Sequence, residues 1–293
     1  MSKVTYNTEK GGYQSKVLLK SVLVYIVLII LTLICLVPLY LLFVQATRTS
    51  SQAVLGFSLV PGSNLGANLK KLGTAYTKFH GFLGVRNSLF IALCCAGLTV
   101  FFAGLTAYGL VVYDFKLKGP AFVFILAVMM VPTQVTSVGF MRMLTNMGLT
   151  DSYIPLILPS IAPPAIVFFM RQYMLSSFPL DIIEAARIDG SNEFRTFLTI
   201  SIPMMKPAFA VQAIFAFISK WNDYYTQSLV LISGNQKQMT MPMMVQYVLA
   251  TRNNADYGAN ALAVFISIVP VAIIYIILSK FIIGGVAAGG VKE

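Results

Sequence analysis

Charged residues are scarce in this 293-residue chain. Asp, Glu, Lys and Arg together make up 11% of it, whereas a soluble domain carries roughly a quarter. Apolar residues reach 57%, and the mean hydropathy is +0.79. So much apolar surface cannot be hidden inside one soluble core, which excludes an ordinary soluble protein and makes lipid the solvent for most of the chain.

Residues that build metal centres and active sites are also few. The chain has one histidine, His80, and three cysteines that all lie inside apolar runs, Cys35, Cys94 and Cys95. Cysteines in such runs are typical of small buried hydrophobes rather than of a disulfide framework or a metal site. The sequence contains no HExxH motif, no paired intramembrane acids and no GxxxxGK[ST] phosphate loop. We therefore predict no catalytic residue, no metal site and no ATP bound in the phosphate-loop manner.

Basic residues outnumber acidic ones, 21 to 10. They stand singly between apolar runs and form no cluster interleaved with aromatic residues, which a nucleic-acid site would need. This pattern favours contact with anionic lipid headgroups and predicts no nucleic-acid partner.

Long apolar runs predict an all-α integral membrane protein with six transmembrane helices. The first run, Ser21–Val44, is roughly 36 Å long as a helix, which exceeds a signal-peptide core and suffices to span. The other five expected spans are Ser88–Val112, Pro120–Met141, Ile154–Met174, Pro207–Ile232 and Ala261–Ile283. An even number of spans puts both termini on one side, and the bias of Lys and Arg favours the cytoplasm.

This count predicts a simple division of the chain. Residues 1–20 would be a cytoplasmic tail, 21–44 the first helix and 45–86 an extracellular loop. Residues 87–283 would form a transmembrane domain of five helices, and 284–293 a second cytoplasmic tail. A short helix is expected near Met243–Leu249 in the last outer loop.

Two of the six spans should be irregular. The fourth contains Pro155, Pro159, Pro163 and Pro164, so its first half must be kinked or partly unwound. The fifth is interrupted at residues 220–228, a polar run almost without aliphatic side chains.

The cytoplasmic loop before the fifth span contains the start and stop signals of two short helices. Asp181 and Glu184 place carboxylates near the positive end of the first helix, at the spacing of a capping box. Gly190 fits the left-handed position that ends a helix, and Ser191 or Asn192 can cap the next one.

The same loop also carries apolar residues, Ile183, Phe194, Phe197 and Leu198. A loop that combines such helix signals with apolar residues is typical of a docking surface for a cytoplasmic partner. The alternative from the residues alone is an interfacial helix that lies on the membrane.

The loop resembles the EAA signature of permease subunits in bacterial ATP-binding-cassette importers. The resemblance rests on Glu184-Ala185-Ala186, then Gly190, then Ile202-Pro203. Three flanking segments point to the carbohydrate-uptake branch, and within it to the maltose-type second permease: Arg86–Leu89, Met147–Thr150 and Trp221–Asp223. The similarity runs from about Asn87 to the C-terminus.

That resemblance implies a type I importer fold in the bacterial inner membrane, with cytoplasmic coupling helices that sit in a groove of an ATPase. We call residues 178–207 the EAA loop. The positions implied to couple to the ATPase are Glu184, Ala185, Ala186, Asp189, Gly190 and Pro203. The implied partners are a second homologous permease, two cytoplasmic ATPase subunits and an extracellular sugar-binding protein. No cofactor belongs to this chain, and ATP and Mg²⁺ would be bound by the ATPase. The glycine-rich tail 284–290 either reaches between the ATPases or is a disordered end.

A substrate path is expected around the polar run of the fifth span, which begins roughly 20 Å from the cytoplasmic end of that helix. Ionisable groups at such depth usually face protein or a cavity, and Lys220 and Asp223 could neutralise each other. The candidate cavity-lining residues are Gln134, Trp221, Asn222, Tyr224 and Tyr225. The alternative is that they hold helices together.

Together these patterns predict the permease subunit of a binding-protein-dependent oligosaccharide importer. A permease for glycerol phosphate or polyamines is the alternative within the family. A secondary transporter would want several membrane-embedded carboxylates, and only Asp223 qualifies.

Overall fold

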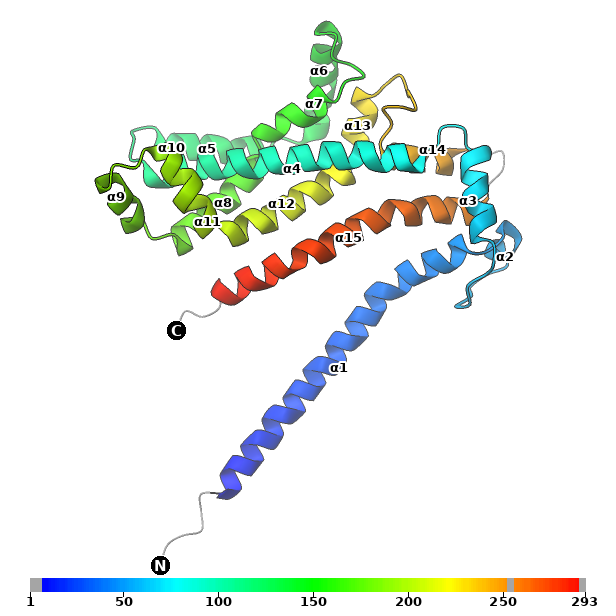
Figure 1. Cartoon of the computed structure of the whole chain (residues 1–293), viewed down its shortest axis with the longest axis horizontal. Helices are drawn as coiled ribbons and strands as arrows, with labels where there is room; N and C mark the ends of the chain where they lie inside the picture. The colour runs from blue at the N-terminus through cyan, green and yellow to red at the C-terminus, as the bar shows by residue number, and fades with distance from the viewer. Residues whose placement is uncertain (1–6, 252–255, 290–293) are drawn as a thin grey trace, which may run out of the picture. The chain divides into compact units, whose positions relative to one another are not determined.

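The computed structural model describes residues 7–251 and 256–289, and within these ranges all regular secondary structure is helical (Figure 1). The chain separates into two units. One comprises the residues up to Leu72 and the described stretch 256–265, and the other runs from Gly73 to 251 and continues from Ile266.

The first unit contains α1 (Asn7–Ala46), α2 (Ser50–Val54), most of α3 (Leu65–Thr74) and the start of α15 (Tyr257–Gly289). The part of α1 long and apolar enough to cross a membrane is Lys20–Ala46. The link between these helices is polar: the Asn68 amide donates to the carbonyls of Ala46 and Arg48 at 2.8 and 2.9 Å. Asp256 accepts hydrogen bonds from Ser50 and Lys71. One buried amide and one ion pair thus hold α1, α3 and the start of α15 together.

The second unit is built around α4 (Gly81–Val112), which packs along α12 and α8. At Gly104 the contact with α12 is so close that a Cβ atom would lie 2.3 Å from the Phe209 ring. Any side chain at position 104 would therefore force the Phe209 ring to move. The other helices of this unit are α5 (Lys118–Met129), α6 (Thr133–Asn146), α7 (Ile154–Ile157), η1 (Leu158–Ile161), α8 (Pro164–Ser177), α9 (Asp181–Ile188), α10 (Glu193–Thr196), η2 (Phe197–Ser201), α11 (Ile202–Met204), α12 (Lys206–Trp221), α13 (Tyr224–Val230) and α14 (Met241–Ala250).

Within the described ranges, four segments are long and apolar enough to span a membrane: Lys20–Ala46, Gly81–Val112, Ile154–Ser177 and Tyr257–Ile277. Two further pairs of helices would each span only if bent. The expected third span is one of them, because α5 and α6 meet at 92°. Pro132, with an extended ψ of 129°, stands between the two helices and explains why Pro120–Met141 is not one straight helix. The six-span count stays a prediction.

The fourth span breaks where its prolines predicted. It consists of α7, the 3₁₀ turn η1 and α8, with Ala162 at φ −119° and ψ 67° between the last two. In a continuous helix the amides of residues 163 and 164 would bond the carbonyls of Pro159 and Ser160, but both residues are proline. The Ala162 amide and the Thr99 hydroxyl donate to these two carbonyls instead, at 3.3 and 2.9 Å.

The fifth span also ends earlier than Pro207–Ile232. Helix α12 stops at Trp221, and the polar run continues as the separate helix α13. The short outer helix expected near Met243–Leu249 is present as α14. The expected tail 284–293 and the N-terminal tail lie partly outside the described residues.

Candidate functional site

The EAA loop folds into α9, α10, η2 and α11, the short helices that precede α12. Helix α9 begins after Leu180, with Asp181 and Glu184 in its first turn. The predicted capping box is wrong, because Asp181 lies inside the helix rather than at its cap, and Leu180 makes no side-chain cap. The two carboxylates still stand near the positive end of the helix, where they are favourable.

The turn between α9 and α10 has the geometry that the sequence predicted. Gly190 has φ +79°. Its backbone amide donates to the Arg187 carbonyl at 3.1 Å, and the Ser191 amide donates to the Ala186 carbonyl at 3.0 Å. These two bonds form a Schellman motif. Asn192 then caps α10 by accepting from the Arg195 amide at 2.8 Å, which decides between the two expected capping residues.

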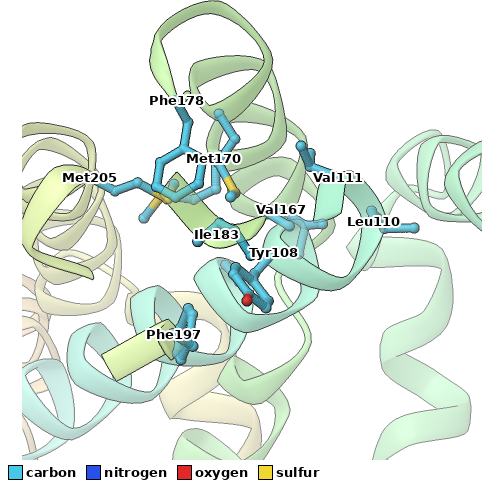
Figure 2. Packing of buried hydrophobic residues seen from close by; sticks show 12 residues of the cluster. Tyr108, Leu110, Val111, Val167, Met170, Phe178, Ile183, Phe197 and Met205 are labelled. Carbon is cyan, nitrogen blue, oxygen red and sulfur yellow. The ribbon is translucent and has the colours of Figure 1, made fainter. Parts of the chain in front are cut away.

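Apolar side chains anchor this turn to the rest of the unit. Ile183 and Phe197 are 1% and 0% exposed and belong to a cluster that also holds residues of α4 and α8 (Figure 2). In that view Phe197 and Tyr108 lie close together, and their ring centroids are 5.5 Å apart. The loop is therefore packed onto the helix bundle rather than hinged from it.

A polar network that the sequence analysis missed ties the two short helices together. The Arg187 guanidinium lies 2.7 Å from the Glu193 carboxylate, which also accepts a hydrogen bond from the Tyr108 hydroxyl at 2.9 Å. The hydrogen bond to Glu193 raises the pKa of Arg187. The signal in the sequence was an Arg and a Glu on either side of the glycine turn, a pairing that helix spacing rules alone do not suggest.

With its anchors buried, the EAA loop presents a mixed acidic and apolar face. Glu184, Ala185, Asp189, Gly190 and Pro203 are exposed, whereas Ala186 is buried. Large apolar side chains of the same loop are exposed as well: Ile188 is 87% exposed and Phe194 is 57% exposed. Five of the six implied coupling residues are thus exposed, whereas Ala186 packs inward.

The residues predicted for the substrate path separate into two groups. Trp221 is fully buried: its indole stacks on Phe217 with ring centroids 5.8 Å apart and donates to the Ser267 carbonyl at 3.2 Å. The packing interpretation therefore fits Trp221. Asn222, Tyr224 and Tyr225 are exposed.

Gln134 is exposed on α6, and that helix reaches α13 through a hydrogen bond from the Tyr225 hydroxyl to Ser137, 2.9 Å long. The predicted neutralisation of Lys220 is present, since its ammonium lies 3.6 Å from the Asp223 carboxylate. Asp223 also caps α13 by accepting from the Thr226 amide at 2.9 Å.

Residues 99–286 match the sequence profile of the family of binding-protein-dependent transport system inner membrane components, and the chain belongs to that family. This membership and the apolar helices make it a multi-pass membrane protein.

Three curated relatives illustrate the range of the family. The chain is 36% identical over 268 residues to the arabinooligosaccharides transport system permease protein AraQ of Bacillus subtilis, covering 89% of this chain and 92% of that protein. It is 27% identical to the lactose transport system permease protein LacG of Rhizobium radiobacter, with coverages of 94% and 97%. It is 28% identical to the sn-glycerol-3-phosphate transport system permease protein UgpE of Yersinia pestis, with coverages of 89% and 94%.

The fold is that of a known transporter. A chain from the crystal structure of a bacterial ABC transporter involved in the import of the acidic polysaccharide alginate superposes with a TM-score of 0.74 and 18% identity. The match covers 95% of this chain and 99% of that one. The expected ABC importer permease fold is therefore confirmed.

Proposed function

We propose that this chain is the permease subunit of an ATP-driven oligosaccharide importer, that it forms half of the translocation pathway, and that it couples to a cytoplasmic ATPase through the EAA loop. Arabinooligosaccharides and lactose are named for two relatives, and the greater identity to the first favours an oligosaccharide over glycerol phosphate.

The EAA loop is the observation that carries the coupling role. A Schellman turn, an Asn cap and the Arg187–Glu193 pair hold its shape. Ile183 and Phe197 are buried in the cluster that also holds residues of α4 and α8. A displacement of the loop's outer face can therefore be transmitted to these two helices. Its outer face bears exposed apolar groups such as Ile188 beside Glu184. Such a face suits a protein groove lined with apolar and basic groups.

The partners follow from the family. A binding-protein-dependent system needs an extracellular sugar-binding protein, and we propose that the membrane part contains a second homologous permease and that two ATPase subunits bind ATP and Mg²⁺. Both termini and the EAA loop would then be cytoplasmic, with residues 45–86 outside.

Reconstitution tests the transport function. The chain is co-expressed with a second permease, ATPase and binding protein from neighbouring genes, and proteoliposomes are assayed with arabinotriose, lactose and sn-glycerol 3-phosphate. We expect uptake of a sugar that requires ATP inside the vesicle. Uptake of glycerol phosphate alone, or sugar uptake without ATP, would contradict the proposal.

Single-cysteine labelling tests the orientation in intact cells. An impermeant thiol reagent should label a cysteine placed at Lys70 but not one placed at Asn192. Labelling at Asn192 and not at Lys70 would reverse the assigned topology.

A further inference from the structure

The second unit contains a cavity of about 830 Å³ between α4, the broken fourth span and α12. That volume lies in the range of roughly 300–1,000 Å³ typical of small-molecule sites. Most of the lining is apolar and includes the rings of Phe169 and Phe215, which are 55% and 62% exposed. Except for Lys220, none of the residues of the polar run 220–228 lines it.

Helix α12 contributes a polar stripe to this cavity. Gln212, Ser219 and Lys220 line it, and after Lys206 the other side chains of α12 are apolar. Lys220 comes eight positions after Gln212, which is roughly 12 Å along the helix axis. Polar groups in a membrane helix are costly unless they face protein partners or a cavity, so their presence on this face calls for a polar occupant.

The polar lining groups outside α12 already make hydrogen bonds within the protein, so the polar stripe on α12 is the part of the lining that can bind a ligand. The Thr99 hydroxyl donates to the Ser160 carbonyl at 2.9 Å, and the Ser160 hydroxyl donates to the Ile157 carbonyl. Among the described residues, by contrast, no hydrogen bond is made by the side chains of Gln212 and Ser219. An amide has two donors and an acceptor, and a hydroxyl has one donor and two acceptor lone pairs. These groups match the hydroxyls of a sugar.

The charge of the cavity selects among solutes. The Lys220 ammonium is the one charged group of the described lining, and the Asp223 carboxylate lies 3.6 Å from it. The pair carries no net charge, so an anionic solute such as a glycerol phosphate or a uronate would find no uncompensated cation. A neutral polyhydroxylated solute suits the site better.

We infer that this cavity is a subsite for a neutral sugar, in which Gln212, Ser219 and Lys220 bind hydroxyl groups and Phe169 and Phe215 cover the apolar faces of the ring. The inference rests on the proposed sugar import and adds that this subunit itself contacts the substrate. It moves the contact from Trp221 and its neighbours to the preceding turns of α12. The competing occupants are a lipid acyl chain and a side chain of the second permease.

The first experiment measures ATP-dependent uptake of arabinotriose and lactose by the complete transporter in proteoliposomes. Gln212→Leu should lower uptake at least tenfold while subunit stoichiometry and basal ATP hydrolysis stay at wild-type levels. Gln172→Leu is the matched control, because Gln172 is exposed on α8 and does not line the cavity. If the wild type imports neither sugar, both the proposed function and the subsite fail. If it imports one and Gln212→Leu imports it equally fast, the subsite alone fails.

The second experiment measures occupancy directly. Ser219→Cys is prepared in a chain with Cys35, Cys94 and Cys95 changed to Ala, and the complex in nanodiscs is alkylated with N-ethylmaleimide. The transported sugar should slow alkylation several-fold, and digalacturonate at equal concentration should not. Asp223→Asn keeps a side chain that can cap α13 but leaves Lys220 uncompensated, so digalacturonate should then protect. A rate unaffected by any sugar would mean that lipid or the second permease fills the cavity, and protection by digalacturonate alone in the parent would overturn the preference for neutral solutes.

Discussion

The EAA loop and the polar run at the end of α12 both stand out in the sequence, yet the structure treats them differently. In the loop, apolar residues such as Ile183 are buried and polar ones such as Glu184 face outward. In the polar run, the aromatic Trp221 is fully buried while its neighbour Asn222 is exposed. The loop behaves like an amphipathic surface of a soluble protein, whereas in the polar run the exposure of each side chain depends on which helices pack against it. Polarity is thus a partial guide to exposure in the loop, where the apolar Ile188 is also exposed, and a poor guide in the polar run.

The sharpest test inside the loop compares two phenylalanines three residues apart. Phe197 is 0% exposed and Phe194 is 57% exposed. Phe197→Ala should destabilise the protein by about 3–5 kcal/mol, the usual cost of emptying a packed aromatic site. Phe194→Ala should change stability by no more than about 0.5 kcal/mol but weaken binding of the ATPase. Thermal unfolding in detergent and co-purification measure the two effects, and equal destabilisation by both changes would mean that the loop is not seated as described.

Trp221 offers the corresponding test in the polar run. Trp221→Ala removes a buried ring and the indole donor to the Ser267 carbonyl, so we expect a loss of about 3–5 kcal/mol and poor assembly of the complex. A variant that assembles and unfolds like the wild type but transports poorly would restore Trp221 to the substrate path.

Gly190 tests whether the turn itself matters. No described residue has an atom within 4 Å of the Cβ position, so the constraint on a substitution is the backbone φ of +79°. Gly190→Val should therefore cost about 1–3 kcal/mol in backbone strain and abolish stimulation of ATP hydrolysis by binding protein and sugar. Gly190→Asn, which tolerates the left-handed conformation, should keep most of it. Equal activity of both variants would remove the turn from the coupling mechanism.

These cases show where prediction from sequence succeeds and where it stops. The glycine turn, the Asn192 cap and the break at the proline-rich span follow from local chemistry, since each depends on residues within one or two turns. The buried state of Trp221 depends on Phe217 and on a carbonyl of α15, 46 residues away. The bend at Pro132 was missed because a proline within a long apolar run fits either a kinked span or two helices. The cavity was missed because its lining comes from three separate segments.

Glu184→Lys probes the outer face of the loop with little effect on folding. Glu184 is exposed in the first turn of α9, so its replacement should cost only about 0.3–1 kcal/mol from the helix dipole. If the ATPase groove is basic, reversed charge should nevertheless lower stimulated ATP hydrolysis at least tenfold. Asp114→Lys makes the same change of charge at another exposed position and should retain stimulation. Stimulation that survives Glu184→Lys would place the coupling contact elsewhere on the loop.

Asn222→Leu has the smallest expected effect on stability and separates the two regions most finely. Asn222 is exposed at the end of α12, and its backbone N–H donates to the Ile218 carbonyl at 3.1 Å. The side chain can therefore be changed without disturbing that hydrogen bond. We expect a change of at most about 0.5 kcal/mol in unfolding free energy and unaltered subunit stoichiometry. If the side chain faces a water-filled path, an apolar group there should lower ATP-dependent sugar uptake several-fold while basal ATP hydrolysis is unchanged. Loss of the assembled complex would instead show that Asn222 meets the second permease, and normal uptake would confine substrate contact in this chain to the cavity beside Gln212 and Ser219.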